Sequence, residues 1–270
     1  MQRIFVMLAF LAASTSVFAQ GKNPLMVREL SEQQAWVDSV YNSMTLKEKI
    51  GQLFMPMVFS NAAKTEIDYV KSLVRDYKIG GIIYSKGGPI TQAKLNNTLQ
   101  ASAKVPLLIS MDAEWGLSMR LDSTYAFPWN MTLGAIKDDD IVREVGKRIG
   151  EHCKRLGVHM NFAPVVDINI NPDNPIIGNR SFGSDKVNVT NKAKAFLEGM
   201  QSAGILGSLK HFPGHGDTAR DEQGIGAACD QISEACHARA RRDLLRGRDL
   251  SGIGELLLER DRIKAIVPRE

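Results

Sequence analysis

The segment KHFPGHGDTARDEQ, residues 210–223, gathers titratable side chains on a stretch that a Pro-Gly pair interrupts. A helix cannot run through this break, so His211 and His215 do not form a helical metal-binding pair, and we expect no metal here. Lys210 and His211 instead close an apolar run typical of a strand. Hydrogen-bond donors at a strand end suit a neutral, hydroxyl-rich ligand. We interpret His215 as a residue that bonds loop backbone.

Two earlier segments also carry side chains suited to a sugar. In SMDAEWGLSMR, residues 110–120, Asp112 and Glu114 directly follow an apolar run. A carboxylate there can accept hydrogen bonds from vicinal hydroxyls, and Trp115 offers an apolar face of the kind on which pyranose rings stack. A solvated loop with a helix-capping aspartate explains this segment equally well.

The segment APVVDININPDNPIIGNRSFGSD, residues 163–185, is dominated by Asn, Pro and Gly and predicts a long ordered loop. Loops of this length in compact domains are usually functional. Arg180 can fork onto two oxygens of a hydroxyl pair or of a carboxylate. The alternative is an arginine that merely ties the loop to a neighbouring carboxylate.

The elements that must position these residues alternate along the chain. Continuous apolar runs are typical of parallel strands covered on both faces, and they predict strands at 52–59, 79–85, 105–112, 158–167 and 205–211. Helical periodicity predicts helices near 34–41, 46–53, 64–77, 91–103, 140–156 and 189–203. Thr45 is the expected N-cap of the second helix, with Glu48 three residues later.

This order fits either an open doubly wound sheet or a (β/α)8 barrel. Asp112, Asp167 and the pair Lys210 and His211 lie at the ends of different strands, where a TIM-type barrel collects its chemistry. No glycine-rich nucleotide fingerprint follows the first strand, which disfavours the open sheet. The sequence therefore predicts an α/β fold, a TIM-type barrel that is incomplete, with about five recognisable strands.

The composition and the N-terminal residues limit the class of protein to which the chain can belong. The 270 residues are 44% hydrophobic with a net charge of +4, which excludes global disorder and gives no reason to expect nucleic acid as a partner. Residues 1–19 have the basic start, short apolar run and small-residue end of a signal peptide. We expect cleavage after Ala19, a periplasmic or secreted location, and no membrane association afterwards. Three cysteines make no disulfide framework, and the oligomeric state stays unknown.

Four motifs together resemble glycoside hydrolase family 3, particularly its bacterial β-N-acetylglucosaminidases: MTLKEKIGQL, GGIIYS, NFAPVVDININPDNPIIGNRSFG and KHFPGHGDT. The resemblance spans residues 30–218. It implies a TIM-type barrel that hydrolyses terminal β-linked N-acetylglucosamine from glycosides such as peptidoglycan or chitin fragments, with retention and without a cofactor. By position, Asp112, Arg180, Lys210 and His211 resemble the residues that hold the sugar ring.

The chain departs from the family pattern just after this match. The branch usually has an Asp-Ser-His motif that supplies the general acid/base, but here Glu222 and Gln223 follow Asp221. Glutamine has no titrating proton, so the resemblance leaves Asp221 as the partner of a missing histidine. The family's nucleophile, an aspartate on a later strand, is unknown in this chain. Activity is therefore doubtful, and a non-catalytic sugar-binding remnant, a β-glucosidase or a phosphorylase are the alternatives.

Residues 219–270 differ in composition from the rest of the chain. They hold 9 Arg and 1 Lys, against 8 Arg and 16 Lys in residues 1–218, and none of the 18 aromatic residues. We interpret this segment as an atypical tail produced by a shifted reading frame near Ala219. A divergent but genuine C-terminus is the alternative.

The nucleotide sequence tests the frame hypothesis. One of the two other reading frames is expected to restore a motif such as Asp-Ser-His soon after Thr218. If both alternative frames lack family-like sequence there, the tail is genuine.

Overall fold

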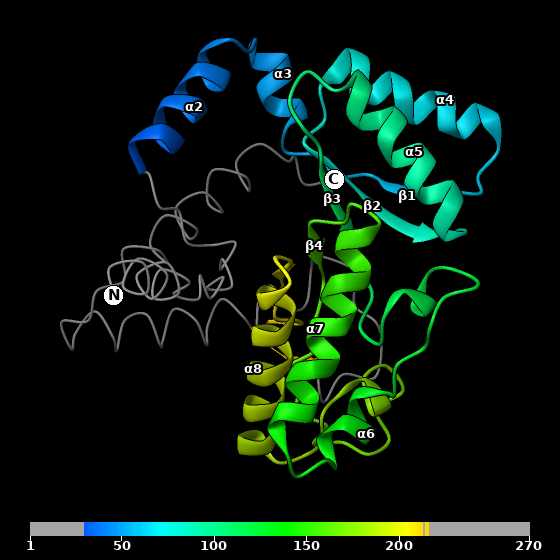
Figure 1. Cartoon of the computed structure of the whole chain (residues 1–270), viewed down its shortest axis with the longest axis vertical. Coiled ribbons are helices and arrows are strands. Elements are labelled where there is room, and N and C mark those ends of the chain that lie inside the picture. The colour runs from blue at the N-terminus through cyan, green and yellow to red at the C-terminus, as the bar shows by residue number, and fades with distance from the viewer. Residues whose placement is uncertain (1–29, 213, 216–270) are drawn as a thin grey trace, which may run out of the picture. The chain divides into compact units, whose positions relative to one another are not determined.

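The computed structural model describes residues 30–212, 214 and 215 (Figure 1). Five parallel strands form one sheet in chain order. They are β1 (Met57–Phe59), β2 (Gly81–Lys86), β3 (Leu108–Met111), β4 (Met160–Asn161) and β5 (Leu206–Gly207). Helices separate consecutive strands, so the predicted parallel βα organisation is confirmed, and the carboxyl ends of all five strands lie at the same edge.

Every predicted helix is present. The α-helices are α2 (Leu30–Asn42), α3 (Leu46–Gly51), α4 (Lys64–Ser72), α5 (Pro89–Ser102), α6 (Asn130–Gly134), α7 (Asp139–Arg155) and α8 (Lys186–Ser202). The π-helix η1 (Leu73–Tyr77) extends α4, and η2 (Leu117–Met119) and η3 (Gly178–Arg180) are 3-10 turns.

The expected cap at Thr45 is confirmed. The Thr45 side chain accepts from the Glu48 amide, and the Glu48 carboxylate accepts from the Thr45 amide at 2.8 Å. No helix in the described range is long and apolar enough to cross a membrane.

The paired strands are shorter than the apolar runs that predicted them. In the run 52–59, Leu53 and Phe54 donate to the last carbonyls of α3, so they continue the helix end as a turn. In the run 158–167, pairing stops at Asn161 and resumes only as an isolated bridge between Val165 and Lys210. Pro164 lies in this gap and has no N–H to donate to a ladder.

The core lies between the sheet and its helices. The strands contribute fully buried side chains such as Ile82 and Ile109, and the helices contribute Leu99, Ile149 and Phe196. Figure 1 shows α7 and α8 side by side along most of their length. In the chain, α7 lies between β3 and β4, and α8 lies between β4 and β5.

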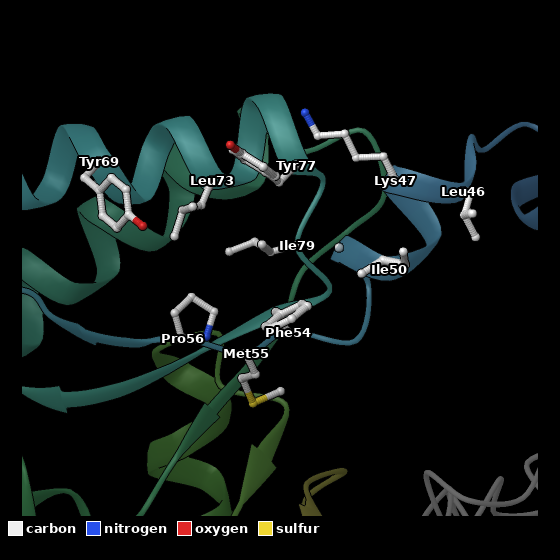
Figure 2. Close-up of a pocket in the computed structure, with 11 residues that line it drawn as sticks. Leu46, Lys47, Ile50, Phe54, Met55, Pro56, Tyr69, Leu73, Tyr77 and Ile79 are labelled. Carbon is white, nitrogen blue, oxygen red and sulfur yellow. The ribbon is translucent and has the colours of Figure 1, made fainter. Parts of the chain in front are cut away.

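An apolar cavity of about 740 Å³ lies among α3, α4, η1 and the segment that leads into β1. Figure 2 shows side chains such as Ile50, Phe54, Leu73 and Ile79 around it. Polar groups make up little of its lining. The cavity contains none of the polar residues that the sequence singled out, so the chemistry lies elsewhere.

Glycine permits the close approach of α7 and α8. A Cβ added at Gly199 on α8 would lie 2.0 Å from the carbonyl oxygen of Arg143 on α7, and one at Gly146 would lie 2.1 Å from the Phe196 carbonyl oxygen. The atoms that such a Cβ would meet belong to the backbone of the other helix, which cannot move aside as a flexible side chain can.

Replacing Gly199 by Ala is therefore expected to force the two helices apart, at a cost of about 1–3 kcal/mol. Amide hydrogen exchange in peptides from α7 and α8 should become faster, by the factor that corresponds to this free-energy cost. Asn191→Ala, at an exposed position of the same helix, is the matched control and should leave exchange unchanged. Equal protection in Gly199→Ala and the unsubstituted chain would contradict the packing described here.

Candidate active site

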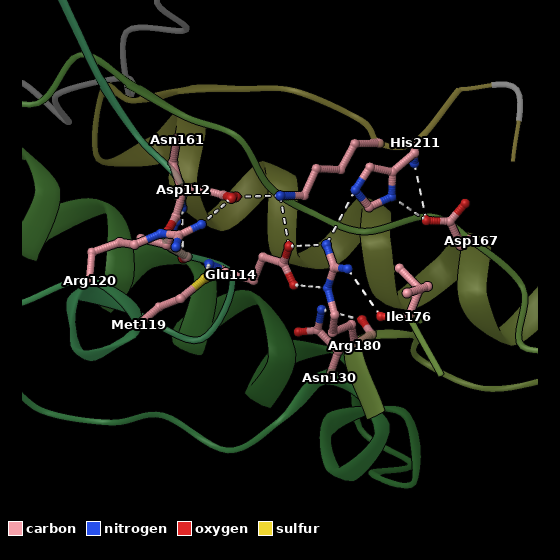
Figure 3. Close-up of polar contacts among 12 residues, drawn as sticks. Asp112, Glu114, Met119, Arg120, Asn130, Asn161, Asp167, Ile176, Arg180 and His211 are labelled. Carbon is pink, nitrogen blue, oxygen red and sulfur yellow. Dashed lines mark hydrogen bonds and ion pairs between the residues drawn. The ribbon is translucent and has the colours of Figure 1, made fainter. Parts of the chain in front are cut away.

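Four residues predicted from the sequence come together beyond the carboxyl ends of the strands (Figure 3). Asp112 directly follows β3, and Lys210 and His211 lie just beyond β5. Arg180 reaches the same place from η3, within the long loop that follows β4. One connected set of ion pairs and hydrogen bonds joins all four side chains.

Asp112 is held between two cations. Its Oδ1 is paired with the Lys210 ammonium, and its Oδ2 lies 2.5 Å from Nη2 of Arg120. Arg120 also donates from Nε to the Asp112 carbonyl oxygen at 3.0 Å. The turn η2 brings Arg120 back to a residue eight positions earlier. Sequence reasoning assigned no role to Arg120, although it ends the segment 110–120 that drew attention.

Glu114 bridges Lys210 and a third cation, Arg180. Its Oε1 lies 2.7 Å from Lys210 Nζ and 2.8 Å from Arg180 Nη2, and its Oε2 accepts from Arg180 Nε at 3.0 Å. The Glu114 side chain is 0% exposed, so this carboxylate cannot reach a ligand. Arg180 therefore ties its loop to a carboxylate, one of the two readings open from the sequence, and its side chain is still partly exposed.

His211 lies between Arg180 and Asp167. Its Nε2 is 3.2 Å from Arg180 Nη2, and its Nδ1 is 2.7 Å from Asp167 Oδ2. A guanidinium only donates hydrogen bonds, so Nε2 accepts and Nδ1 carries the proton that is donated to Asp167. Both ring nitrogens of His211 are therefore engaged within the cluster.

Asp167 and two asparagines order the surrounding loops. The buried Asp167 carboxylate also accepts from the backbone amides of His211 at 3.1 Å and His215 at 2.6 Å. Asn174 donates to the His215 carbonyl at 2.9 Å, and Asn130 donates to the Arg180 carbonyl at 2.7 Å. The loop 163–185 is therefore ordered and attached to the cluster, as its composition predicted.

The charges of the cluster are stabilised by one another. Burial opposes ionisation of Asp112, but Lys210 and then Arg120 outweigh it and lower the pKa of the carboxyl group. Burial likewise opposes ionisation of Asp167, and hydrogen bonds from His211 and from the His215 amide lower its pKa. Burial also disfavours the charged form of Arg180, yet its hydrogen bonds to Glu114 raise the guanidinium pKa. Both aspartates are therefore ionised at neutral pH.

The cluster keeps hydrogen-bonding capacity for a ligand. Five of its side chains are 14–33% exposed: Asp112, Arg120, Arg180, Lys210 and His211. Contacts within the described range use two of the three N–H donors of Lys210, and each Asp112 oxygen retains a lone pair. Donors and acceptors side by side suit vicinal hydroxyl groups, each of which donates and accepts. No group of three or more His, Cys, Asp or Glu side chains within residues 30–212, 214 and 215 could hold a metal ion.

Parallel βα units with a polar cluster at the carboxyl ends of the strands define a protein of the TIM-barrel type, represented by five strands in the part of the chain that the structure describes. The chain belongs to glycosyl hydrolase family 3, because the model of that family's N-terminal domain matches residues 45–238. The predicted family and barrel type are thus confirmed.

Curated relatives carry names from one group of enzymes. The chain is 36% identical over 188 residues to a β-N-acetylglucosaminidase/β-glucosidase of Cellulomonas fimi, covering 70% of this chain and 33% of the relative. It is 34% identical over 228 residues to β-hexosaminidase A of Pseudoalteromonas piscicida, covering 79% of this chain and 37% of the relative. The chain therefore spans only about a third of the length of these relatives.

Solved structures agree on the fold. A β-glucoside phosphorylase, BglX, bound to 2FGlc is similar with a TM-score of 0.66 and 28% identity, over 71% of this chain and 34% of that chain. A family 3 β-N-acetylglucosaminidase from Paenibacillus sp. str. FPU-7 is similar with a TM-score of 0.60 and 40% identity, over 67% of this chain and 35% of that chain.

Several predictions fall outside the described residues. Asp221, the expected partner of a missing acid/base histidine, lies there, as do the predicted signal peptide 1–19 and the tail 219–270. The nucleophile stays unassigned. These remain predictions from the sequence.

Glu114→Gln tests the bridging carboxylate. The amide keeps the shape but removes the charge between Lys210 and Arg180, and breaking a buried ion pair costs about 3–5 kcal/mol. We expect a loss of that size in the free energy of unfolding, measured by urea denaturation. Asp68→Asn, which breaks an exposed pair with Lys64, should change it little. A similar small effect for both variants would contradict the bridging role.

Proposed function

We propose that the polar cluster binds the terminal β-linked N-acetylglucosamine of glycosides such as peptidoglycan or chitin fragments. The chain would then be the sugar-binding part of a retaining hydrolase that needs no cofactor. The observation that supports this most is the convergence of Asp112, Lys210, Arg180 and His211 on one place. Names of the relatives, β-N-acetylglucosaminidase and β-hexosaminidase, support the sugar and the reaction.

The chemistry of the cluster suits binding and orientation. Asp112 accepts hydrogen bonds from sugar hydroxyls, while Lys210 and Arg120 donate to their oxygens. Arg180 holds the adjacent part of the ring and His211 orients Arg180, while Glu114 and Asp167 fix the positions of these two side chains. A neutral sugar can replace the solvent at these groups without separating any of the ion pairs.

The covalent step requires other groups. Retaining hydrolysis uses two groups about 5 Å apart on either side of the glycosidic bond. Glu114 and Asp167 have fully buried side chains, so neither can attack a sugar. Asp112 is committed to its two cations. We therefore leave the nucleophile unassigned and keep Asp221 as a sequence-based candidate for the acid/base pair.

Two alternatives each have an observation in their favour. A sugar-binding remnant without turnover is favoured by Gln223, which stands where the family's acid/base histidine is expected. A β-glucosidase or a phosphorylase is favoured by the similarity to the phosphorylase BglX. We also propose export to the periplasm or the medium, on the basis of the signal-like residues 1–19.

Calorimetric titration with N-acetylglucosamine tests the binding site. Lys210→Met removes a charged hydrogen-bond donor worth about 1.5–3 kcal/mol, so affinity should fall roughly tenfold to hundredfold. Lys104→Met, which breaks a pair with Glu48 away from the cluster, is the control and should not change affinity.

Release of chromophore from an aryl N-acetyl-β-glucosaminide then separates the alternatives. Release shows the hydrolase, and binding without release shows the remnant. Preference for an aryl β-glucoside would favour the β-glucosidase alternative, and a requirement for phosphate would favour the phosphorylase. Equal affinity of Lys210→Met and the unsubstituted chain would exclude the cluster as the sugar site.

A further inference from the structure

The connection from β3 to α6 gathers four of the chain's aromatic residues in fifteen positions: Trp115, Tyr125, Phe127 and Trp129. The two tryptophan rings lie against each other, with centroids 4.1 Å apart and planes tilted by 35°. The Phe127 amide donates to the Trp115 carbonyl at 3.1 Å, which holds the two ends of the segment together. The tryptophan pair is therefore a fixed feature of the loop.

Each tryptophan is adjacent in the chain to a residue that contacts Arg180. Trp115 directly follows Glu114, the carboxylate that bridges Lys210 and Arg180. Trp129 directly precedes Asn130, whose side chain donates to the Arg180 carbonyl at 2.7 Å. Because consecutive Cα atoms are about 3.8 Å apart, Trp115 starts one residue from a member of the cluster, and Trp129 starts one residue from the asparagine that holds the Arg180 backbone.

Trp129 is not used to fill the core. It is 43% exposed, although Trp115 covers part of it. An indole face is apolar and carries partial negative charge, whereas the C–H face of a sugar ring is apolar with partial positive charge. The two surfaces are complementary, and neither carries a net charge.

We propose that Trp129, supported by Trp115, is a stacking platform for a second sugar ring, next to the ring held by the polar cluster. This inference rests on the proposed function and extends it, since it makes an oligosaccharide a better ligand than a single N-acetylglucosamine. The platform selects for a sugar at the neighbouring position by shape and apolar contact.

Tryptophan fluorescence can follow the binding, because the full chain has only three tryptophans, Trp36, Trp115 and Trp129. The ligands are N-acetylglucosamine and its β-1,4-linked disaccharide. The unsubstituted chain should bind the disaccharide about two- to tenfold more tightly than the monosaccharide, as expected for one aromatic stacking contact. Trp129→Ala should lose this gain while its monosaccharide affinity stays close to that of the unsubstituted chain.

Two further variants complete the test. Trp129→Phe keeps an aromatic face and should keep most of the preference for the disaccharide. This variant still tests the platform if Trp129→Ala does not fold. Trp36→Ala removes an exposed tryptophan of α2 and should leave both affinities unchanged.

The outcomes separate the two claims. If the monosaccharide binds and the disaccharide binds no more tightly, the platform is wrong and the proposed function stands. The platform is also wrong if Trp129→Ala still binds the disaccharide more tightly than the monosaccharide. It is equally wrong if Trp129→Phe folds but no longer prefers the disaccharide. If neither sugar binds the unsubstituted chain, the proposed function fails and the platform fails with it.

Discussion

The site depends on a single buried carboxylate. Lys210 and Arg180 come from different segments, and both contact the same oxygen of Glu114. Without that oxygen, two cations would face each other in a partly desolvated place, where repulsion is strong. A buried carboxylate is equally unfavourable without its cations. The end of β3, the loop after β4 and the end of β5 must therefore dock together, so the site and this part of the fold form as one unit.

The position of the site followed from the sequence because it depends on strand order. Asp112, Lys210 and His211 close apolar runs, and parallel strands bring such ends to one edge. The sequence could not predict which carboxylate is able to contact a ligand and which only holds its neighbours. Asp112 and Glu114 are two positions apart and chemically alike, yet one is partly exposed and the other fully buried. Only burial distinguishes a group that can touch a ligand from one that holds its neighbours.

Strand and helix boundaries show a related limit. An apolar run reports burial, whereas a strand also needs a partner for its backbone groups. The run 158–167 is buried over much of its length but is paired at only two of its residues before Pro164. The short α6 went unpredicted because its five residues span little more than one turn. Arg120 was missed because its contact with Asp112 depends on the 3-10 turn between them, which has no sequence pattern of its own.

The charges of the cluster also cancel. Three carboxylates, Asp112, Glu114 and Asp167, face three cations, Arg120, Arg180 and Lys210. Dissolved ions screen the attraction between a charged ligand and a charged surface. When the ligand and the cluster are each neutral overall, there is little such attraction for the ions to weaken. Capture of an uncharged molecule by this cluster would therefore proceed almost equally well in dilute and in saline surroundings.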